Sequence, residues 1–215
     1  MSILKVDTIN ETANNGNIAV IPTGSGKLVL DGLTWPHADG SAGQIIKSNG
    51  SGVLSFIDAP SAGFTQTAEV ATTTGNSVSI TGIASGAKLV IVMLNNVSSA
   101  SGGDFKLRIG DAGGIETSGY DTKGLDIQSS TATHTDATDG WLIEEQVGGG
   151  CSFTGQIFLT LQDASNHHWV GTGNFQNGIS YGFTGGDKAL SAELTQLALI
   201  SASTFDAGTV NVLFQ

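Results

Sequence analysis

The feature that most constrains this chain is the alternation of apolar and polar residues with a period of two. In "GQIFLTLQ", Ile157, Leu159 and Leu161 fall on the same face of an extended strand. No window longer than ten residues holds a helical period of 3.6 that is free of glycine or of β-branched runs. We therefore predict an all-β chain.

The predicted strands are short and are bounded by turn residues. They cover residues 3–9, 18–21, 27–33, 44–47, 53–57, 66–72, 77–83, 88–95, 105–109, 125–129, 140–146, 152–161, 168–173, 188–201 and 208–214. Residues 188–201 also have helical propensity, but Thr195 and the surrounding strands favour a strand there. Glycine contributes 31 of 215 residues, about twice the usual share of roughly 7%, which fits many strands joined by tight turns.

Two regions of the chain differ in the length of their strands and in the spacing of their turns, and we predict a boundary between residues 60 and 61. Residues 1–60 hold short strands with a turn every few residues, and they contain too few large apolar residues to bury a core alone. This region is expected to share a core with copies of itself. Residues 61–215 hold roughly eight longer strands, which suit an antiparallel β-sandwich of the jelly-roll type.

The charge balance excludes several classes of partner. The net charge is −11, and Arg108 is the single arginine, whereas nucleic-acid binding needs clustered cations and an anionic membrane surface would repel the chain. The longest apolar run, "LVIVML", is too short to span a bilayer. The opening "MSILKVDTINE" carries Lys5, Asp7 and Glu11 too early for a signal peptide, so we expect synthesis in a cytosol without separate export.

The stretch "IPTGSGKLVL" looks like a phosphate-binding loop, but it departs from that motif at two positions. The motif G-x-x-x-x-G-K-[ST] needs glycine where this chain has Ile21 and a hydroxyl where it has Leu28. The following residues have strand spacing and not helical spacing. We therefore predict a hairpin turn at Gly24, Ser25 and Gly26, and no nucleotide site.

The segment "PHADGSAGQIIKSNGSGVLSF" resembles a cassette of tail-fibre and other virion appendage proteins of tailed bacteriophages, particularly marine and cyanobacterial phages. That cassette reads roughly P-x-x-D-G-s-A-G-Q-x-L-x-T-N-G-S-G-x-L-S-F. The opening "SILKVDTINE", the internal "LRIGDAGGIETSGY", "GQIFLTL" and "HHWVGTG", and the closing "TFDAGTVNVLFQ" resemble other parts of such proteins. The resemblance spans nearly the whole chain.

The resemblance implies a structural virion protein that forms a homotrimer and needs no cofactor. Residues 1–60 would form a trimeric, β-prism-like hairpin region that attaches to other virion proteins through Ile3, Leu4, Val6 and Ile9. Residues 61–215 would form a knob that binds a host cell-surface glycan or protein. Two alternatives stay open at this point, a capsid-decoration or head-fibre protein without a receptor role, and a tailspike that hydrolyses glycans.

Candidate receptor-binding residues are aromatics in or near turns and the amides beside them, because carbohydrate sites combine flat rings with hydrogen-bonding side chains. They are Tyr120, Trp141, Trp169, Asn174, Phe175, Gln176 and Tyr181. The alternative is that these aromatics belong to the core or to a trimer interface.

Catalytic and metal sites are not expected. His167 and His168 would point to opposite faces of a strand, and His134, Asp136 and Asp139 lack the spacing of a calcium loop. The carboxylates most able to converge, across a turn, are Asp111 and Glu116. The one cysteine, Cys151, is expected to be a small buried residue at the start of a strand, and it excludes an internal disulfide.

Overall fold

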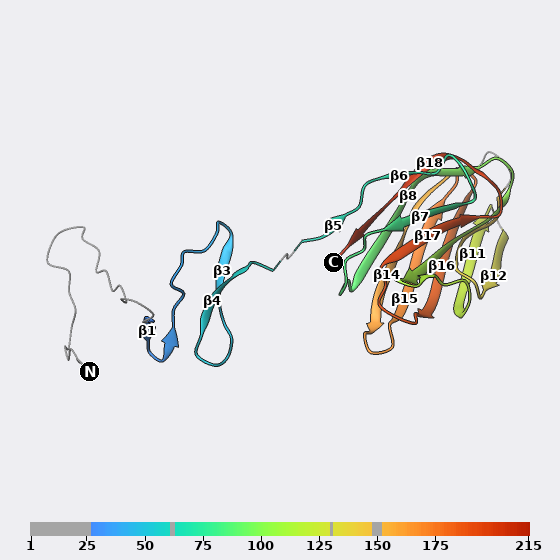
Figure 1. The fold of residues 1–215 in the computed structure, drawn as a ribbon. Helices are drawn as coiled ribbons and strands as arrows, with labels where there is room; N and C mark the ends of the chain where they lie inside the picture. Colours follow the sequence, from blue (N-terminus) through green and yellow to red (C-terminus); the bar gives the residue numbers. More distant parts are fainter. Residues whose placement is uncertain (1–26, 61–62, 130, 148–151) are drawn as a thin grey trace, which may run out of the picture. The chain divides into compact units, whose positions relative to one another are not determined.

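The computed structural model describes residues 27–60, 63–129, 131–147 and 152–215, and it confirms the all-β prediction. Strands and turns make up these residues, with no helix among them. The chain divides into two compact units, residues 1–62 and 63–215 (Figure 1). The division lies two residues beyond the boundary expected from the sequence.

The described part of the first unit consists of two small hairpins. β1 (Val29–Leu30) pairs with β2 (Leu33–Thr34), and β3 (Gln44–Ser48) pairs with β4 (Leu54–Asp58). Residues 27–33, predicted as one strand, instead turn back at Asp31 and Gly32, whose φ angles are 51° and 78°. Two positive φ angles are what a two-residue hairpin turn of type I′ requires, and Asp-Gly is one of the pairs that tolerates them best.

The hairpins of the first unit bury none of their own residues. Every described residue from 27 to 60 is exposed or half-exposed. Ile45 and Ile46 are neighbours on β3 and so point to opposite faces, yet they are 44% and 45% exposed. Both faces of the β3–β4 hairpin therefore carry apolar area that a single chain leaves in water.

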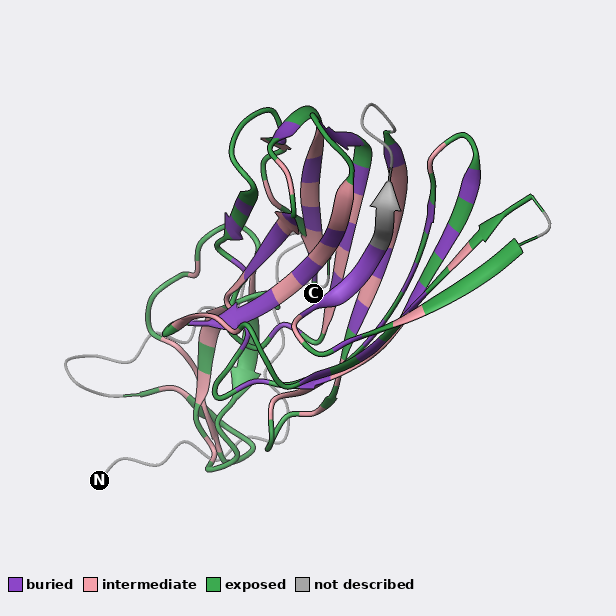
Figure 2. Ribbon diagram, turned by 90° about the vertical axis from the view of Figure 1, so that its right-hand side faces the viewer, coloured by how far each residue is buried: buried purple, intermediate pink, exposed green. Residues whose placement is uncertain are grey.

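The second unit is a β-sandwich, as predicted, built from a large curled antiparallel sheet and a smaller one (Figures 1 and 2). The order of strands in the large sheet is β12-β11-β16-β15-β14-β8-β18-β5, with β6 also paired to β18. Its strands are β5 (Thr65–Gln66), β6 (Val70–Ala71), β8 (Leu89–Ser99), β11 (Tyr120–Gln128), β12 (Thr131–Ala137), β14 (Phe153–Asp163), β15 (His168–Gln176), β16 (Ser180–Ala189) and β18 (Phe205–Phe214).

The smaller sheet runs β10-β9-β17-β7, and β13 pairs with β9. Its strands are β7 (Ser77–Thr81), β9 (Gly103–Asp111), β10 (Gly114–Ile115), β13 (Trp141–Val147) and β17 (Gln196–Ser201). Along most strands of the sandwich, buried residues alternate with exposed or half-exposed ones, as Figure 2 shows. The alternation arises because successive side chains of a strand point to opposite faces.

Aromatic side chains fill the space between the two sheets. Phe105 of β9 packs edge-to-face against Phe153 of β14, with ring centroids 4.5 Å apart. Phe153 in turn meets Phe175 of β15 at 6.4 Å, and Phe105 meets Phe205 of β18 at 5.9 Å. This chain of rings connects both sheets and makes the sandwich one hydrophobic core.

The structure also departs from the predicted strands within the sandwich. Residues 66–72, predicted as one strand, contain the end of β5 and the separate short strand β6. Residues 188–201 are not one strand, since β16 ends at Ala189 and β17 begins at Gln196 in the other sheet. The apolar–polar alternation of these residues suggested a strand. Leu190 and Leu194 lie instead in the loop between β16 and β17, and their side chains are buried in the core. The sequence prediction also missed β12, which has no large apolar residue to show an alternation, and most of β16, where three glycines lower the strand propensity.

Glycine lets the large sheet approach Trp141 of the smaller one. A Cβ atom on Gly171 of β15 would lie 2.6 Å from Nε1 of Trp141 and 2.7 Å from a methyl carbon of Leu159. Both distances are shorter than any van der Waals contact, so a larger residue would force the sheets apart. Gly171 is thus required by packing and not by a turn.

We predict that Gly171→Ala lowers the free energy of unfolding by about 1–3 kcal/mol, because it overpacks the core. Gly185→Ala on β16 is the matched control, since the nearest atom to its new Cβ would be 3.9 Å away. Urea unfolding of both variants measures the difference. Equal stability of the two variants would contradict the close packing of Trp141 against Gly171.

Candidate functional site

Three of the predicted receptor-binding aromatics lie in the core and not on the surface. Tyr120, Trp141 and Trp169 are all buried, so their rings have no free face for a ligand. The prediction is wrong for these residues, and the alternative of core aromatics holds for them. They begin or lie within strands β11, β13 and β15, where alternation turns them toward the opposite sheet.

Tyr120 has a structural role at the edge of the core. Its ring packs edge-to-face against Trp141 with centroids 5.3 Å apart. Its hydroxyl accepts a hydrogen bond from the Ile109 amide at 2.9 Å and lies 2.9 Å from the Glu116 carbonyl oxygen, to which it donates. Burial raises the pKa of Tyr120 to about 12, so the hydroxyl keeps its proton and its donor role at neutral pH.

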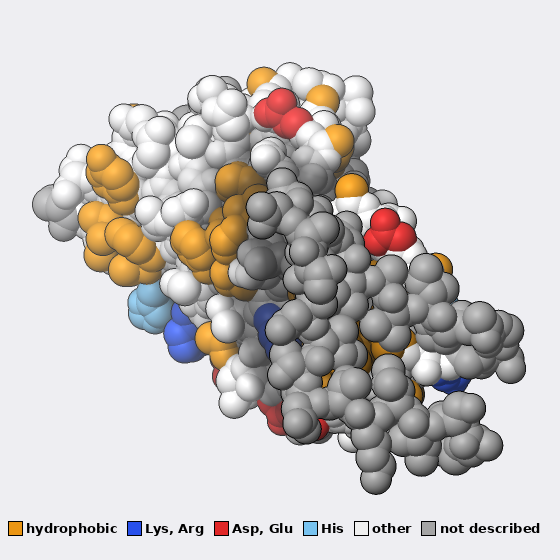
Figure 3. All heavy atoms as spheres, turned by 90° about the vertical axis from the view of Figure 1, so that its left-hand side faces the viewer, with side chains coloured by type: hydrophobic (Ala, Val, Ile, Leu, Met, Phe, Trp, Pro, Cys, Tyr) orange, Lys and Arg blue, Asp and Glu red, His pale blue; other side chains and the backbone are white. Residues whose placement is uncertain are grey.

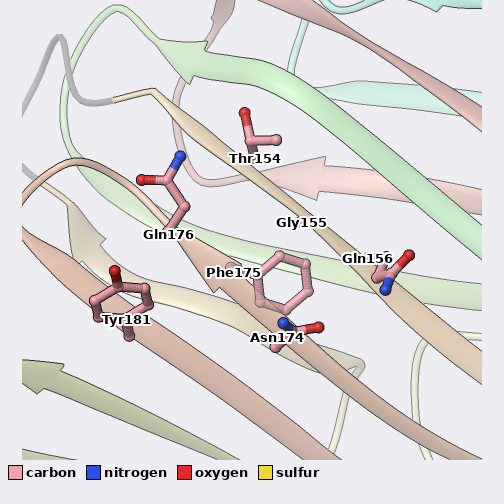
Figure 4. A pocket seen from close by; sticks show the side chains of 7 residues that line it. All are labelled: Thr154, Gly155, Gln156, Asn174, Phe175, Gln176 and Tyr181. Carbon is pink, nitrogen blue, oxygen red and sulfur yellow. The ribbon is translucent and has the colours of Figure 1, made fainter.

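The other four predicted residues come together on two neighbouring strands of the large sheet. Asn174, Phe175, Gln176 and Tyr181 line a shallow depression of about 310 Å³. Thr154, Gly155 and Gln156 of β14 complete the lining (Figure 4). The depression therefore crosses three adjacent strands, β14, β15 and β16, which are hydrogen-bonded to one another.

The register of these strands sets the side chains in two rows. In the first row Thr154 lies opposite Gln176, which lies opposite Tyr181. In the second row Gln156 lies opposite Asn174. Directly opposed residues have Cβ atoms about 4.5–5.5 Å apart, and successive outward residues on one strand are about 6.6 Å apart. The rows thus form a small polar grid with an aromatic ring at one corner.

The floor of the depression is backbone. Gly155 and Phe175 face each other across β14 and β15, and Phe175 is buried with its ring in the core. Phe175 therefore offers no stacking face, which corrects its prediction as a receptor-binding aromatic. A Cβ on Gly155 would lie 2.6 Å from the Phe175 ring. Glycine at 155 thus allows Phe175 to lie across the inner face while the outer face stays shallow.

Most of the polar side-chain groups that line the depression make no hydrogen bond to the described part of the chain. The Thr154 hydroxyl oxygen accepts from the Asn96 amide at 3.0 Å, and the Gln176 side-chain oxygen accepts from the Gly178 amide at 3.2 Å. The side chains of Gln156, Asn174 and Tyr181 make no hydrogen bond to the described part of the chain. These groups are left to water or to a ligand.

An apolar stripe borders the depression. On β16, Tyr181 is 66% exposed and Phe183 is 45% exposed. They lie opposite Ile127 and Leu125 of β11, which are also exposed. The face drawn in Figure 3 shows hydrophobic side chains gathered in patches among neighbours that are mostly uncharged. Exposed apolar side chains that gather on a rigid sheet are typical of binding surfaces.

The carboxylates Asp111 and Glu116 do come together, but both accept hydrogen bonds from Ser191. The Ser191 hydroxyl donates to Asp111 at 2.5 Å, and the Ser191 amide donates to Glu116 at 2.7 Å. Glu116 also pairs with Lys188, which is buried. This cluster fastens the loop between β16 and β17 to the β9–β10 turn.

The pKa shifts in this cluster are those expected for a structural ion pair. Hydrogen bonds from the Ser191 hydroxyl and the Gly113 amide lower the pKa of Asp111. Burial alone would raise the pKa of Glu116, but hydrogen bonds from Lys188 and Ser191 outweigh it and lower that pKa. Both groups are ionised at neutral pH, whereas a general acid for glycan hydrolysis needs a raised pKa.

The remaining charged candidates are separated from one another. Asp139 pairs with Lys106 at 2.9 Å and Arg108 at 2.7 Å, whereas Asp136 pairs with Lys123 on another strand. In the described ranges no group of three or more histidines, cysteines and carboxylates is placed to hold a metal ion.

The two adjacent histidines differ from their prediction. His167 lies in a turn with a φ of 48°, while His168 begins β15 and contacts Gln162 and Asp187.

Several predicted positions lie outside the described residues. They are the predicted strands 3–9 and 18–21, the attachment residues Ile3, Leu4, Val6 and Ile9, the predicted turn at Gly24 to Gly26, and Cys151.

Thr154 and Gln156 are the site residues that sequence reasoning missed. The signal was present, since both occupy the outward positions of "FTGQIF" between Phe153, Gly155 and Ile157. The pairing of β14 with β15, which brings them beside Asn174 and Gln176, could not be read from either strand alone.

Comparisons with protein-family models, curated proteins and solved structures gave no match to this chain. Within the described residues, no helix is long and apolar enough to cross a membrane.

We predict that the sandwich loses stability as the pH falls below about 4.5. The ordinary pKa values of Asp111 and Glu116, 3.8 and 4.5, are lowered in the fold. Their contribution is therefore present above those values and is lost as acid protonates the folded groups. Glu116→Gln should cost about 1–3 kcal/mol at pH 7, because it leaves Lys188 buried without its charge partner. It should also flatten the change of Tm between pH 5 and pH 3.

Thermal unfolding followed by circular dichroism across pH measures both effects. Asp121→Asn is the control, since Asp121 lies exposed on the neighbouring strand β11. A Glu116→Gln variant as stable as the parent at pH 7, with the same acid profile, would show that the Glu116–Lys188 pair does not stabilise the fold.

Proposed function

We propose that this chain is a structural protein of a tailed-phage virion, a homotrimeric fibre or spike whose C-terminal sandwich binds the host surface. The observation that carries the proposal is the contrast between the two units. The described residues 27–60 bury nothing, while residues 63–215 have a complete core of their own. A chain built this way has one part that needs partners and one part that does not.

The hairpin unit is best explained by self-association. Fully burying an isoleucine side chain contributes about 1.5–3 kcal/mol, and Ile45, Ile46, Val29 and Leu30 are all left exposed. Copies of the same hairpins offer the same apolar surfaces to one another, and closed symmetry satisfies all of them at once. The resemblance of residues 33–58 to phage appendage cassettes favours three copies and a place on the virion.

The sandwich supplies the surface that would meet the host. Its outer sheet face presents the depression between β14 and β16 and the apolar stripe beside it. The side chains stand on hydrogen-bonded strands, so the surface is formed before any partner arrives. The chain carries a net charge of −11, which fits a protein–glycan or protein–protein contact better than a nucleic-acid contact.

The test is competition for adsorption. Purified full-length protein, sized first by light scattering, is added to host cells before infection. We predict a trimeric mass and a dose-dependent fall in phage adsorption, because soluble trimers occupy the receptors. A trimer that neither binds cells nor blocks adsorption would contradict the receptor role and favour capsid decoration, which the unburied hairpins fit equally well. A monomer at micromolar concentration would contradict the proposal itself.

A second prediction concerns the hairpins directly. The double substitution Ile45→Ser and Ile46→Ser should dissociate the oligomer at concentrations where the parent is intact, because it removes apolar area from both faces of β3. Lys47→Ser is the matched control, since Lys47 is an exposed polar residue of the same strand. Light scattering over a dilution series measures the midpoint of dissociation, and equal midpoints would show that these faces are not the interface.

A further inference from the structure

We propose that the depression formed by Thr154, Gln156, Asn174, Gln176 and Tyr181 binds an uncharged sugar ring, with one face of the ring stacked on Tyr181. The inference deepens the proposed function and rests on it, because it names the chemical class of receptor that the sandwich recognises. It also assigns roles to Thr154 and Gln156, which sequence reasoning had not singled out.

The first step is the chemistry of the lining. Its polar side chains are three amides and two hydroxyls. An amide offers two donors and an acceptor, and a hydroxyl offers one donor and two lone pairs. Sugar hydroxyls likewise donate and accept at the same oxygen, so they are satisfied best by groups that do both. The side chains of Gln156, Asn174 and Tyr181 make no hydrogen bond to the described part of the chain, so their capacity is available.

The second step is the aromatic wall. Tyr181 is 66% exposed, yet it belongs to β16 and lies opposite Ile127 of β11 and Gln176 of β15. A tyrosine ring provides a large flat apolar face while losing little conformational entropy. The C–H face of a pyranose is the part of a sugar that an apolar ring can desolvate favourably. Its hydroxyls would then point along the rows toward Gln176 and Asn174.

The third step is the scale of the grid. Neighbouring side chains across strands are about 5 Å apart, and those along a strand are about 6.6 Å apart. A single sugar ring touching Tyr181 can therefore reach both rows. The volume of about 310 Å³ suits one ring with part of a second, and the open shape leaves room for the rest of a chain.

The fourth step is the absence of charge from the lining. None of the seven residues that line the depression is charged. A carboxylate placed among them would lose hydration without gaining a cation. The net charge of −11 adds long-range repulsion of anions. The geometry therefore selects neutral hexoses and N-acetylhexosamines over uronic and sialic acids.

The experiment uses full-length protein and two sets of soluble sugars. The neutral set is the methyl glycosides of glucose, mannose, galactose and N-acetylglucosamine, and the acidic set is the methyl glycosides of glucuronic acid and N-acetylneuraminic acid. Saturation-transfer NMR identifies binding, and calorimetry measures affinity. We expect at least one neutral sugar to bind and both acidic sugars to bind at least tenfold more weakly.

Variants locate the contact. Tyr181→Ala should weaken binding of the neutral sugar about tenfold or more, and Asn174→Ala should weaken it about three- to tenfold through lost hydrogen bonds. Tyr181→Phe should retain most of the affinity, because it keeps the stacking face. Val170→Ala is the matched control, because Val170 is an exposed residue on the same face of β15 but lies outside the depression. It should change affinity less than twofold.

The outcomes separate this inference from the proposed function. Binding of acidic sugars alone, binding of no sugar, or binding unchanged in Tyr181→Ala would overturn the inference. A Tyr181→Ala protein with a changed oligomeric mass would show that this face is a contact between copies, which would also overturn it. If the parent and Tyr181→Ala block phage adsorption equally, the receptor role of the sandwich stands, but the receptor binds at a surface other than this depression.

Discussion

The sandwich depends on how closely its two sheets approach at β13. Trp141 and Leu142 of this strand occupy the space that side chains at two glycines of the large sheet would need. A Cβ atom on Gly171 of β15 would meet Trp141, and one on Gly124 of β11 would meet Leu142. Large side chains on one sheet are thus matched by glycine on the other. This complementarity gives the core the close packing on which its stability rests.

The same constraint shapes the outer face. Around the depression, Phe153, Ile157 and Phe175 of β14 and β15 point inward, so the polar residues at alternate positions of these two strands stand outward in regular rows. On β16 it is the aromatic residues Tyr181 and Phe183 that stand outward. The Gly155–Phe175 pair is the local example, since the ring lies inside and the floor outside is backbone. The candidate site is therefore a consequence of core packing, and it needs no loop to be held in place.

The two units show how much of this could be read from the sequence. Alternation of residues predicted the all-β class and most strands, because period-two burial is a local property. Among the predicted site residues, Asn174, Gln176 and Tyr181 do lie exposed on one sheet face. The prediction failed for Tyr120, Trp141 and Trp169, because a large aromatic near a turn signal has the same local sequence whether the strand beside it faces solvent or the other sheet.

Composition and spacing along the chain are enough to establish the strand content, the shortage of core-forming residues before residue 60, and the negative net charge that argues against nucleic-acid partners. Only the folded structure shows which residues lie together on one surface. Thr154 lies more than twenty residues before Gln176 and Tyr181 in the sequence, and hydrogen bonds between β14, β15 and β16 set the register that brings them together. That register depends on long-range pairing and core packing, which no local pattern encodes.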